Sequence, residues 1–131
     1  MSEARPIVLD SSAVLTLLQR ETGWEEVANV LAGARISAVN LSEVTAKLLE
    51  RGLDIASVHA AIRELGLKVD AFGATDARAA GALRVATRFA GLSLGDRACV
   101  ALAIRRGATC YTADQAWHRL ALPGLFLVVI R

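Results

Sequence analysis

The chain has 131 residues, of which 54% are hydrophobic and 21% charged, and its formal net charge is +2. This composition is typical of one folded domain and excludes the polar, highly charged class of disordered chains. No apolar run approaches the roughly 18 residues of a membrane span, and the opening MSEARPIVLD lacks the pattern of a secretory signal. We therefore expect a cytoplasmic protein with no membrane partner.

Short apolar runs alternate with longer segments of helical periodicity. In chain order we predict a strand at 6–9, helices at 11–20 and 24–32, a strand at 35–38, helices at 40–51 and 54–65, a strand at 67–71, helices at 75–89 and 93–106, a strand at 108–111, a short helix at 113–120 and a strand at 125–130. This alternation predicts an α/β domain with a mainly parallel sheet. Such sheets bind ligands beyond the carboxyl ends of their strands, where the strand order reverses.

Four acidic side chains stand at the ends of predicted elements: Asp10, Glu43, Asp96 and Asp114. Carboxylates gathered at one end of a sheet repel one another unless a cation lies among them. Oxygen ligands without histidine or cysteine favour Mg²⁺ or Mn²⁺ over zinc. Thirteen of the fifteen cations are arginine, which binds phosphate well, and a basic remainder around an acidic pocket suits a polyanionic substrate.

The same acids can also be interpreted as helix caps. The runs 40–43 (NLSE) and 93–96 (SLGD) both resemble capping boxes, and Asp10 and Asp114 could each cap the helix that follows. On that interpretation the chain is a binding module without catalysis. Asp76 is expected to be an N-terminal helix cap in either case.

Other catalytic chemistries have no support in the sequence. The run after the first strand is Asp10-Ser11-Ser12, which lacks the Asp-x-Asp of haloacid-dehalogenase phosphatases and the Asp-x-Glu of exonucleases of the ribonuclease H type. There is no glycine-rich phosphate loop. Cys99 and Cys110 lack the C-x-x-C spacing of zinc and redox motifs, so we expect two packed thiols.

Three stretches of the chain resemble the PIN-domain ribonucleases, and among them the VapC-like toxins of type II toxin–antitoxin pairs. They are IVLDSSAVLTLL at 7–18, ISAVNLSEVTAKLLERG at 36–52 and GLSLGDRACVALAIRRGATCYTADQAW at 91–117. The resemblance implies that residues 1–131 form a single PIN domain. Its expected fold has three layers, with a central, mainly parallel five-stranded sheet flanked by helices, and its members often form homodimers.

The resemblance also implies an activity, namely Mg²⁺-dependent hydrolysis of RNA phosphodiester bonds by an endoribonuclease that inhibits translation, with Mn²⁺ able to substitute. The implied catalytic residues are Asp10, Glu43, Asp96 and Asp114. Of these, Asp10, Asp96 and Asp114 are expected to bind the metal, and Glu43 to complete the site or hold a water.

Further residues match supporting positions in the family. Ser11 and Thr112 are expected to orient the acids through hydrogen bonds. Arg97, Arg88 and Arg20 are candidates to bind substrate phosphates, although Arg97 could instead form an ion pair with the acid that precedes it. Aromatic residues make up only 5% of the chain, which argues against recognition of single-stranded RNA by stacking.

Two partners are expected beside RNA, a cognate antitoxin and a second copy of the chain. The helices predicted at 11–20 and 24–32 carry more apolar residues than one core-facing stripe needs. They form either a helix pair buried on both sides or a groove for an antitoxin segment. Trp24 and Trp117 are expected to pack in or beside the core. An RNA-processing PIN nuclease without an antitoxin remains an alternative within the family.

Overall fold

The computed structural model describes residues 4–131. Five parallel strands form its central sheet, in the order β3-β2-β1-β4-β5. Their bounds are Ile7–Leu9 for β1, Arg35–Ser37 for β2, Lys68–Asp70 for β3, Thr109–Thr112 for β4 and Phe126–Val129 for β5. The order reverses between β1 and β4, so the crevice at which such sheets bind ligands lies at the carboxyl ends of these two strands. The predicted five-stranded α/β fold is confirmed.

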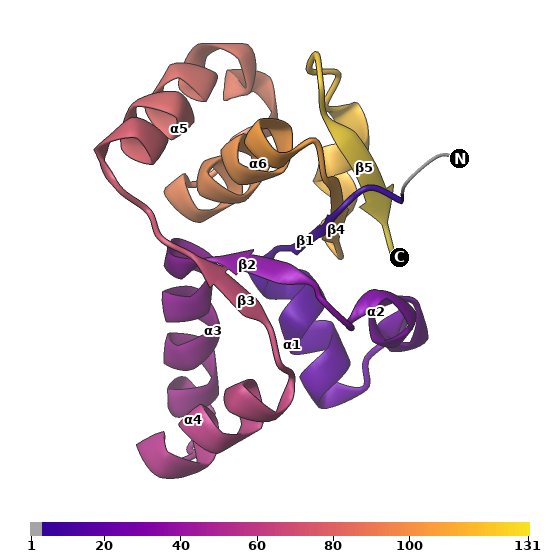
Figure 1. Ribbon diagram of the computed structural model, residues 1–131, viewed down its shortest axis with the longest axis vertical. Coiled ribbons are helices and arrows are strands. Elements are labelled where there is room, and N and C mark those ends of the chain that lie inside the picture. The colour runs from indigo at the N-terminus through magenta and orange to yellow at the C-terminus, as the bar shows by residue number, and fades with distance from the viewer. Residues whose placement is uncertain (1–3) are drawn as a thin grey trace.

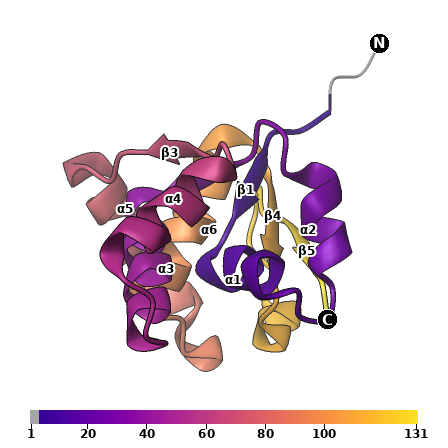
Figure 2. The same cartoon turned by 90° about the horizontal axis from the view of Figure 1, so that it is seen from below.

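Helices cover both faces of the sheet. Within residues 4–131 they are α1 (Ser11–Gln19), α2 (Trp24–Val30), α3 (Ala38–Glu50), α4 (Ile55–Glu64), α5 (Ala74–Ala86) and α6 (Leu94–Arg106), together with the short 3₁₀ helices η1 (Arg88–Ala90) and η2 (Gln115–Arg119). Figure 1 shows α5 and α6 on one side of the strands and α1 to α4 on the other. Figure 2 gives the same arrangement from below. No helix in this part of the chain is both long and apolar enough to cross a membrane.

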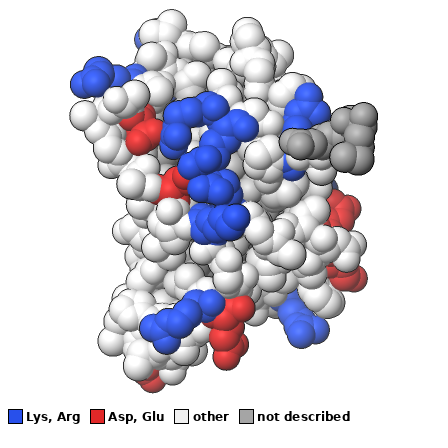
Figure 3. All heavy atoms as spheres, in the orientation of Figure 1, with Lys and Arg blue, Asp and Glu red and all other residues white. Residues whose placement is uncertain are grey.

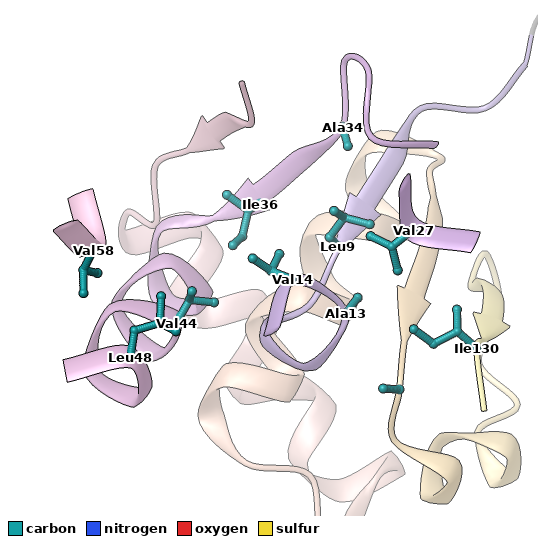
Figure 4. Close-up of a cluster of buried hydrophobic side chains, with 11 residues drawn as sticks. Leu9, Ala13, Val14, Val27, Ala34, Ile36, Val44, Leu48, Val58 and Ile130 are labelled. Atoms are coloured by element: carbon teal, nitrogen blue, oxygen red, sulfur yellow. The ribbon is translucent and has the colours of Figure 1, made fainter. Parts of the chain in front are cut away.

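Each face of the sheet has its own core. Leu9 packs with Val14, Ile36 and other side chains between the sheet and α1 to α4 (Figure 4). Its neighbour Val8 packs on the opposite face with residues of α6 and with the buried Trp117. Successive side chains of a strand point to opposite faces, so a strand buried on both sides reads as a continuous apolar run.

The two cysteines are free and fully buried in the α6-side core, with their Sγ atoms 3.3 Å apart. The expectation of two packed thiols is confirmed. The hydrogen bond to Cys110 and burial both raise the pKa of the Cys99 thiol.

Helix boundaries differ from the prediction by up to three residues, and two of the differences have a visible cause. The helix expected at 75–89 ends at Ala86, because Thr87 leaves the helical conformation at φ −112° and its hydroxyl bonds back to the carbonyl of Leu83 (2.7 Å). The helix expected from residue 40 starts at Ala38, and Ser37 caps it by accepting a bond from the N–H of Val39 (3.2 Å). The expected capping box at 40–43 is therefore wrong, whereas the N-terminal capping role of Asp76 in α5 is confirmed.

A buried acid ties the edge strand β3 to its neighbours. Asp70 accepts bonds from the Nε atoms of Arg35 (2.8 Å) and Arg106 (3.0 Å). Burial opposes ionisation of Asp70, but the bonds from both arginines outweigh it and lower its pKa. Figure 3 shows Lys and Arg side chains gathered in the middle of the face that is turned towards the viewer in Figure 1.

Candidate active site

The four predicted acids line one hollow at the carboxyl end of the sheet. It has a volume of about 190 Å³. Asp10 follows β1 and Asp114 follows β4, the two strands between which the order reverses. Glu43 and Asp96 reach the same hollow from the first halves of α3 and α6. The structure thus brings together all four side chains, although they are far apart in the sequence.

Asp10 lies at the bottom of the hollow and is 3% exposed. Its Oδ1 accepts bonds from the N–H of Ala13 (2.8 Å) and the hydroxyl of Ser12 (2.7 Å), and its Oδ2 accepts from the hydroxyl of Thr112 (2.5 Å). Burial raises the pKa of Asp10 to about 6, because it outweighs these three bonds and repulsion from Asp96 acts in the same direction. The side chain also caps α1, and its three hydrogen-bond donors are all uncharged.

Asp96 and Asp114 are also caps. Asp96 completes the predicted capping box with Ser93 through bonds of 3.0 and 3.2 Å, and Asp114 accepts from the N–H of Ala116 (2.9 Å). Within the described chain each uses one oxygen in this way and leaves the other without a hydrogen bond. Burial raises the pKa of Asp96. Repulsion from Asp114 and Glu43 raises it further, and the bonds from Ser93 oppose this rise. Capping and ligand binding are therefore compatible at both positions.

Glu43 is held in a fixed position by neutral donors. The hydroxyl of Ser11 (2.5 Å) and the amide Nδ2 of Asn40 (2.8 Å) both donate to its Oε1. The same amide lies 3.1 Å from the carbonyl of Gly95 in α6. A Cβ atom at Gly95 would overlap the Glu43 carboxylate, so only glycine lets α6 approach this closely.

Sequence reasoning missed several residues of this site. Asn40 precedes Glu43 by three residues and so shares its helix face, where it donates to Glu43 rather than capping α3. Lys47 follows Glu43 by one helical turn and is the one cation among residues 4–131 that lines the hollow. Ser12 donates to Asp10 and accepts from the N–H of Ala113 (2.8 Å). Helical spacing could have identified Lys47, whereas no local signal distinguishes Gly95 from any other glycine.

Ser11 and Thr112 lie where the sequence placed them, each donating to one of the acids. Arg97 points away, because its Nη1 bonds to the carbonyl of Ala80 in α5 (3.0 Å). Among the ion pairs of residues 4–131 there is none between Arg97 and Asp96.

The other two arginines expected to bind substrate lie in different places. Arg20 ends α1, with its guanidinium carbon 4.6 Å from the centre of a Trp24 ring. It therefore stands a whole helix, roughly 14 Å along the axis, from Asp10. Arg88 is exposed in η1, just ahead of the Ser93 cap.

The donors of the hollow suit a hard divalent cation. In the described part of the chain no three Asp, Glu, His or Cys side chains are gathered closely enough to hold a metal as they stand. All four acidic groups that line the hollow are nevertheless oxygen donors, and two of them have a free oxygen. Burial and mutual repulsion raise the pKa values of Asp10 and Asp96, and a cation bound among these acids would oppose both effects.

The model of the PIN-domain family matches residues 7–122. The chain belongs to the PIN-domain family. Solved structures similar to this PIN domain include VapBC2 from Rickettsia felis bound to a promoter DNA fragment, at 18% identity and a TM-score of 0.72 over 94% of this chain and 97% of that chain. DNA-bound VapBC from Salmonella typhimurium matches at 19% identity and a TM-score of 0.72, over 97% of this chain and 99% of that chain. VapBC-5 from Mycobacterium tuberculosis, of the VapBC family of toxin–antitoxin systems, matches at 18% identity and a TM-score of 0.67, over 98% of this chain and 100% of that chain. No curated protein matches the chain.

Proposed function

We propose that this PIN domain is a divalent-metal-dependent endoribonuclease that acts as the toxin of a toxin–antitoxin pair. The observation that carries the proposal is the convergence of Asp10, Glu43, Asp96 and Asp114 on one hollow at the strand-order reversal. Acids that served only as helix caps would have no reason to share a cavity, and their mutual repulsion opposes it.

Within the hollow the residues divide into two groups. Asp10, Asp96 and Asp114 would hold Mg²⁺, or Mn²⁺ in its place. When bound, such an ion lowers the pKa of water and stabilises the charge that grows on the phosphate during hydrolysis. Glu43 already accepts two side-chain bonds, which fixes its carboxylate at the wall of the hollow. It is thereby suited to orient a water molecule. Thr112 holds the buried Asp10 in place.

The test compares two acids with the same local role. Asp96 and Asp76 both sit at the third position of a helix and bond back to the cap residue, but only Asp96 faces the hollow. The purified chain should cut a structured RNA with Mg²⁺ or Mn²⁺ and should stop with EDTA. Asp96→Asn should abolish cutting, whereas Asp76→Asn should leave it unchanged. Cutting by Asp96→Asn at the wild-type rate would show that the site is misassigned.

We infer that the partner is an antitoxin, in keeping with the toxin–antitoxin complexes among the similar structures. On the first two helices Val14 and Val27 are fully buried in the core, whereas Leu15, Leu18 and Trp24 are only partly buried, so the groove expected there stays a prediction. A larger hollow of about 340 Å³ lies between α3, α4 and the neighbouring strands β2 and β3. Apolar residues line it, among them Leu41, Ile62 and Val69.

Co-expression with the product of an adjacent gene tests this partner. Val69 is 49% exposed at the rim of the larger hollow, so Val69→Glu should weaken co-purification without unfolding the chain. Val85→Glu, at a 73% exposed position on α5, is the matched control. Equal co-purification of both variants with the partner would exclude this hollow. Light scattering of the chain alone tests the homodimer, which remains a prediction from the resemblance.

A further inference from the structure

An aromatic ring and an arginine are stacked at the surface beside the acidic hollow. Phe89 in η1 is 53% exposed, and the guanidinium carbon of Arg119 in η2 lies 5.2 Å from the centre of its ring. Leu94, in the first turn of α6, is 52% exposed as well. Phe89 owes its position to the early end of α5 at Thr87, which turns η1 away from the helix axis.

Both members of the pair are tethered to acids of the hollow. η1 leads through a short loop to Ser93, which bonds to Asp96, and η2 begins at Asp114. Five residues of 3₁₀ helix span roughly 10 Å, so Arg119 stands about that far from the acid. The yellow-orange helical turn beneath β4 in Figure 2 is η2, at the end of the sheet where β1 and β4 finish. An RNA strand that leaves the hollow on this side would pass over the ring.

The positive charge near Phe89 favours a nucleic acid over a second copy of the chain as the molecule that binds there. Arg84, Arg88 and Arg119 are all exposed, and none of them forms an ion pair within residues 4–131. A second copy related by a twofold axis would bring these arginines against their own equivalents, which is unfavourable. A nucleic acid offers phosphates to the arginines and an aromatic base to the ring.

We propose that Phe89 and Arg119 form a stacking platform for one RNA base next to the scissile phosphodiester, and that Arg88 binds a backbone phosphate. The inference rests on the proposed ribonuclease function and adds a base-binding subsite to it. Bases stack on aromatic rings and on guanidinium planes with little regard to base identity. One platform suffices for one base, so the low aromatic content of the chain does not exclude stacking at this position.

The experiment measures binding and cutting separately. Dissociation constants for a short single-stranded RNA are measured in EDTA, and cleavage is measured with Mg²⁺. Phe89→Ala should weaken binding by about 5- to 150-fold, the range that one stacked base contributes. It should raise KM and leave kcat nearly unchanged, whereas Phe89→Trp should retain binding. Arg88→Gln should lower the slope of log Kd against log salt by about 0.7, as expected for one lost phosphate contact.

An abasic RNA identifies the base involved. One abasic residue is moved through the positions that flank the cleavage site. At one position it should weaken wild-type binding as much as Phe89→Ala does, and it should have no further effect on that variant.

Phe126 supplies the matched control. It is 40% exposed and stacked on Arg5, but it opens β5 at the amino end of the sheet. Phe126→Ala should therefore leave binding unchanged.

Three results would overturn the platform. In the first, Phe89→Ala binds and cuts like the wild type. In the second, the abasic and Phe89→Ala effects multiply at every position. In the third, Phe89→Ala dissociates a dimer without changing the RNA affinity of the monomer. Because wild-type cleavage is measured in the same series, a wild type that cuts RNA while Phe89→Ala has no effect refutes the platform alone. A wild type that does not cut RNA refutes the ribonuclease proposal instead.

Discussion

Replacing Asp10 by asparagine should stabilise the metal-free chain while it destroys the proposed site. The pKa of Asp10 is about 6 in the folded chain, against an ordinary value of 3.8. Each pKa unit corresponds to about 1.4 kcal/mol, so the ionised carboxylate destabilises the fold by up to about 3 kcal/mol. Asparagine caps a helix as well as aspartate does. Its amide can donate to the Thr112 hydroxyl, which can accept as readily as it donates.

The raised pKa of Asp10 also determines how the stability difference between Asp10→Asn and the wild type changes with pH. The folded chain holds the Asp10 proton to a higher pH than the unfolded chain, so the penalty is absent below about pH 3.8. It grows as the pH rises and is complete above about pH 6. The advantage of Asp10→Asn should therefore be largest at neutral pH and should vanish towards pH 4.

Urea denaturation in EDTA at pH 7.5 and at pH 4.5 measures this difference. We expect a gain of 1 to 3 kcal/mol at the higher pH, which raises the Tm by roughly 4 °C per kcal/mol. Asp54→Asn is the control, because Asp54 caps α4 at a fully exposed position and bonds from Ser57 lower its pKa. It should give no gain. The reasoning fails if Asp10→Asn is less stable than the wild type at pH 7.5 in EDTA.

Adding Mn²⁺ should reverse the order of the two proteins. An ion that binds only the folded chain raises its stability by about 4 kcal/mol at a thousand times its Kd. The wild type should gain this stability, and Asp10→Asn should gain little. Equal shifts of the Tm in both proteins would show that the ion binds elsewhere.

Three other predictions concern Gly95, Asp70 and Lys47, and Gly81 supplies a control. Gly95→Ala should cost about 1 to 3 kcal/mol in the free energy of unfolding and lower cleavage, because its Cβ would overlap Glu43. Gly81 lies in open space on α5 and is the control. Gly81→Ala should stabilise the chain by about 0.5 to 1 kcal/mol. Asp70→Asn should destabilise by about 2 kcal/mol at pH 7, and this difference should shrink as the pH falls below about 3.8, because the unfolded chain then becomes protonated at this carboxyl before the folded chain does. Lys47→Met should bind Mn²⁺ a few-fold more tightly in calorimetry and RNA more weakly, since it removes the cation that lines the hollow; unchanged affinities would place Lys47 outside the site.

Local signals predicted most of the elements correctly. Ser93 with Asp96, and Asp54 before α4, are caps that the sequence marks by residue type and spacing. The errors lie at helix ends, where more than one side chain could bond to the terminal backbone groups. Ser37 rather than Asn40 caps α3, since the amide of Asn40 is used by Glu43. Thr87 ends α5 early by bonding back to the preceding turn, which its residue type alone does not predict.

The sequence by itself determined the α/β alternation, the position of each acid at an element end and, through its motifs, the family. Only the tertiary structure decided the strand order and therefore which residues meet. Thr112 and Asp10 are 102 residues apart, and their bond exists because β1 and β4 are neighbours. The close approach of Gly95 to Glu43 and the burial that raises the pKa of Asp10 depend in the same way on how α1, α3 and α6 pack. Periodicity and caps act within a few residues, whereas a site assembled from five elements depends on contacts between distant segments.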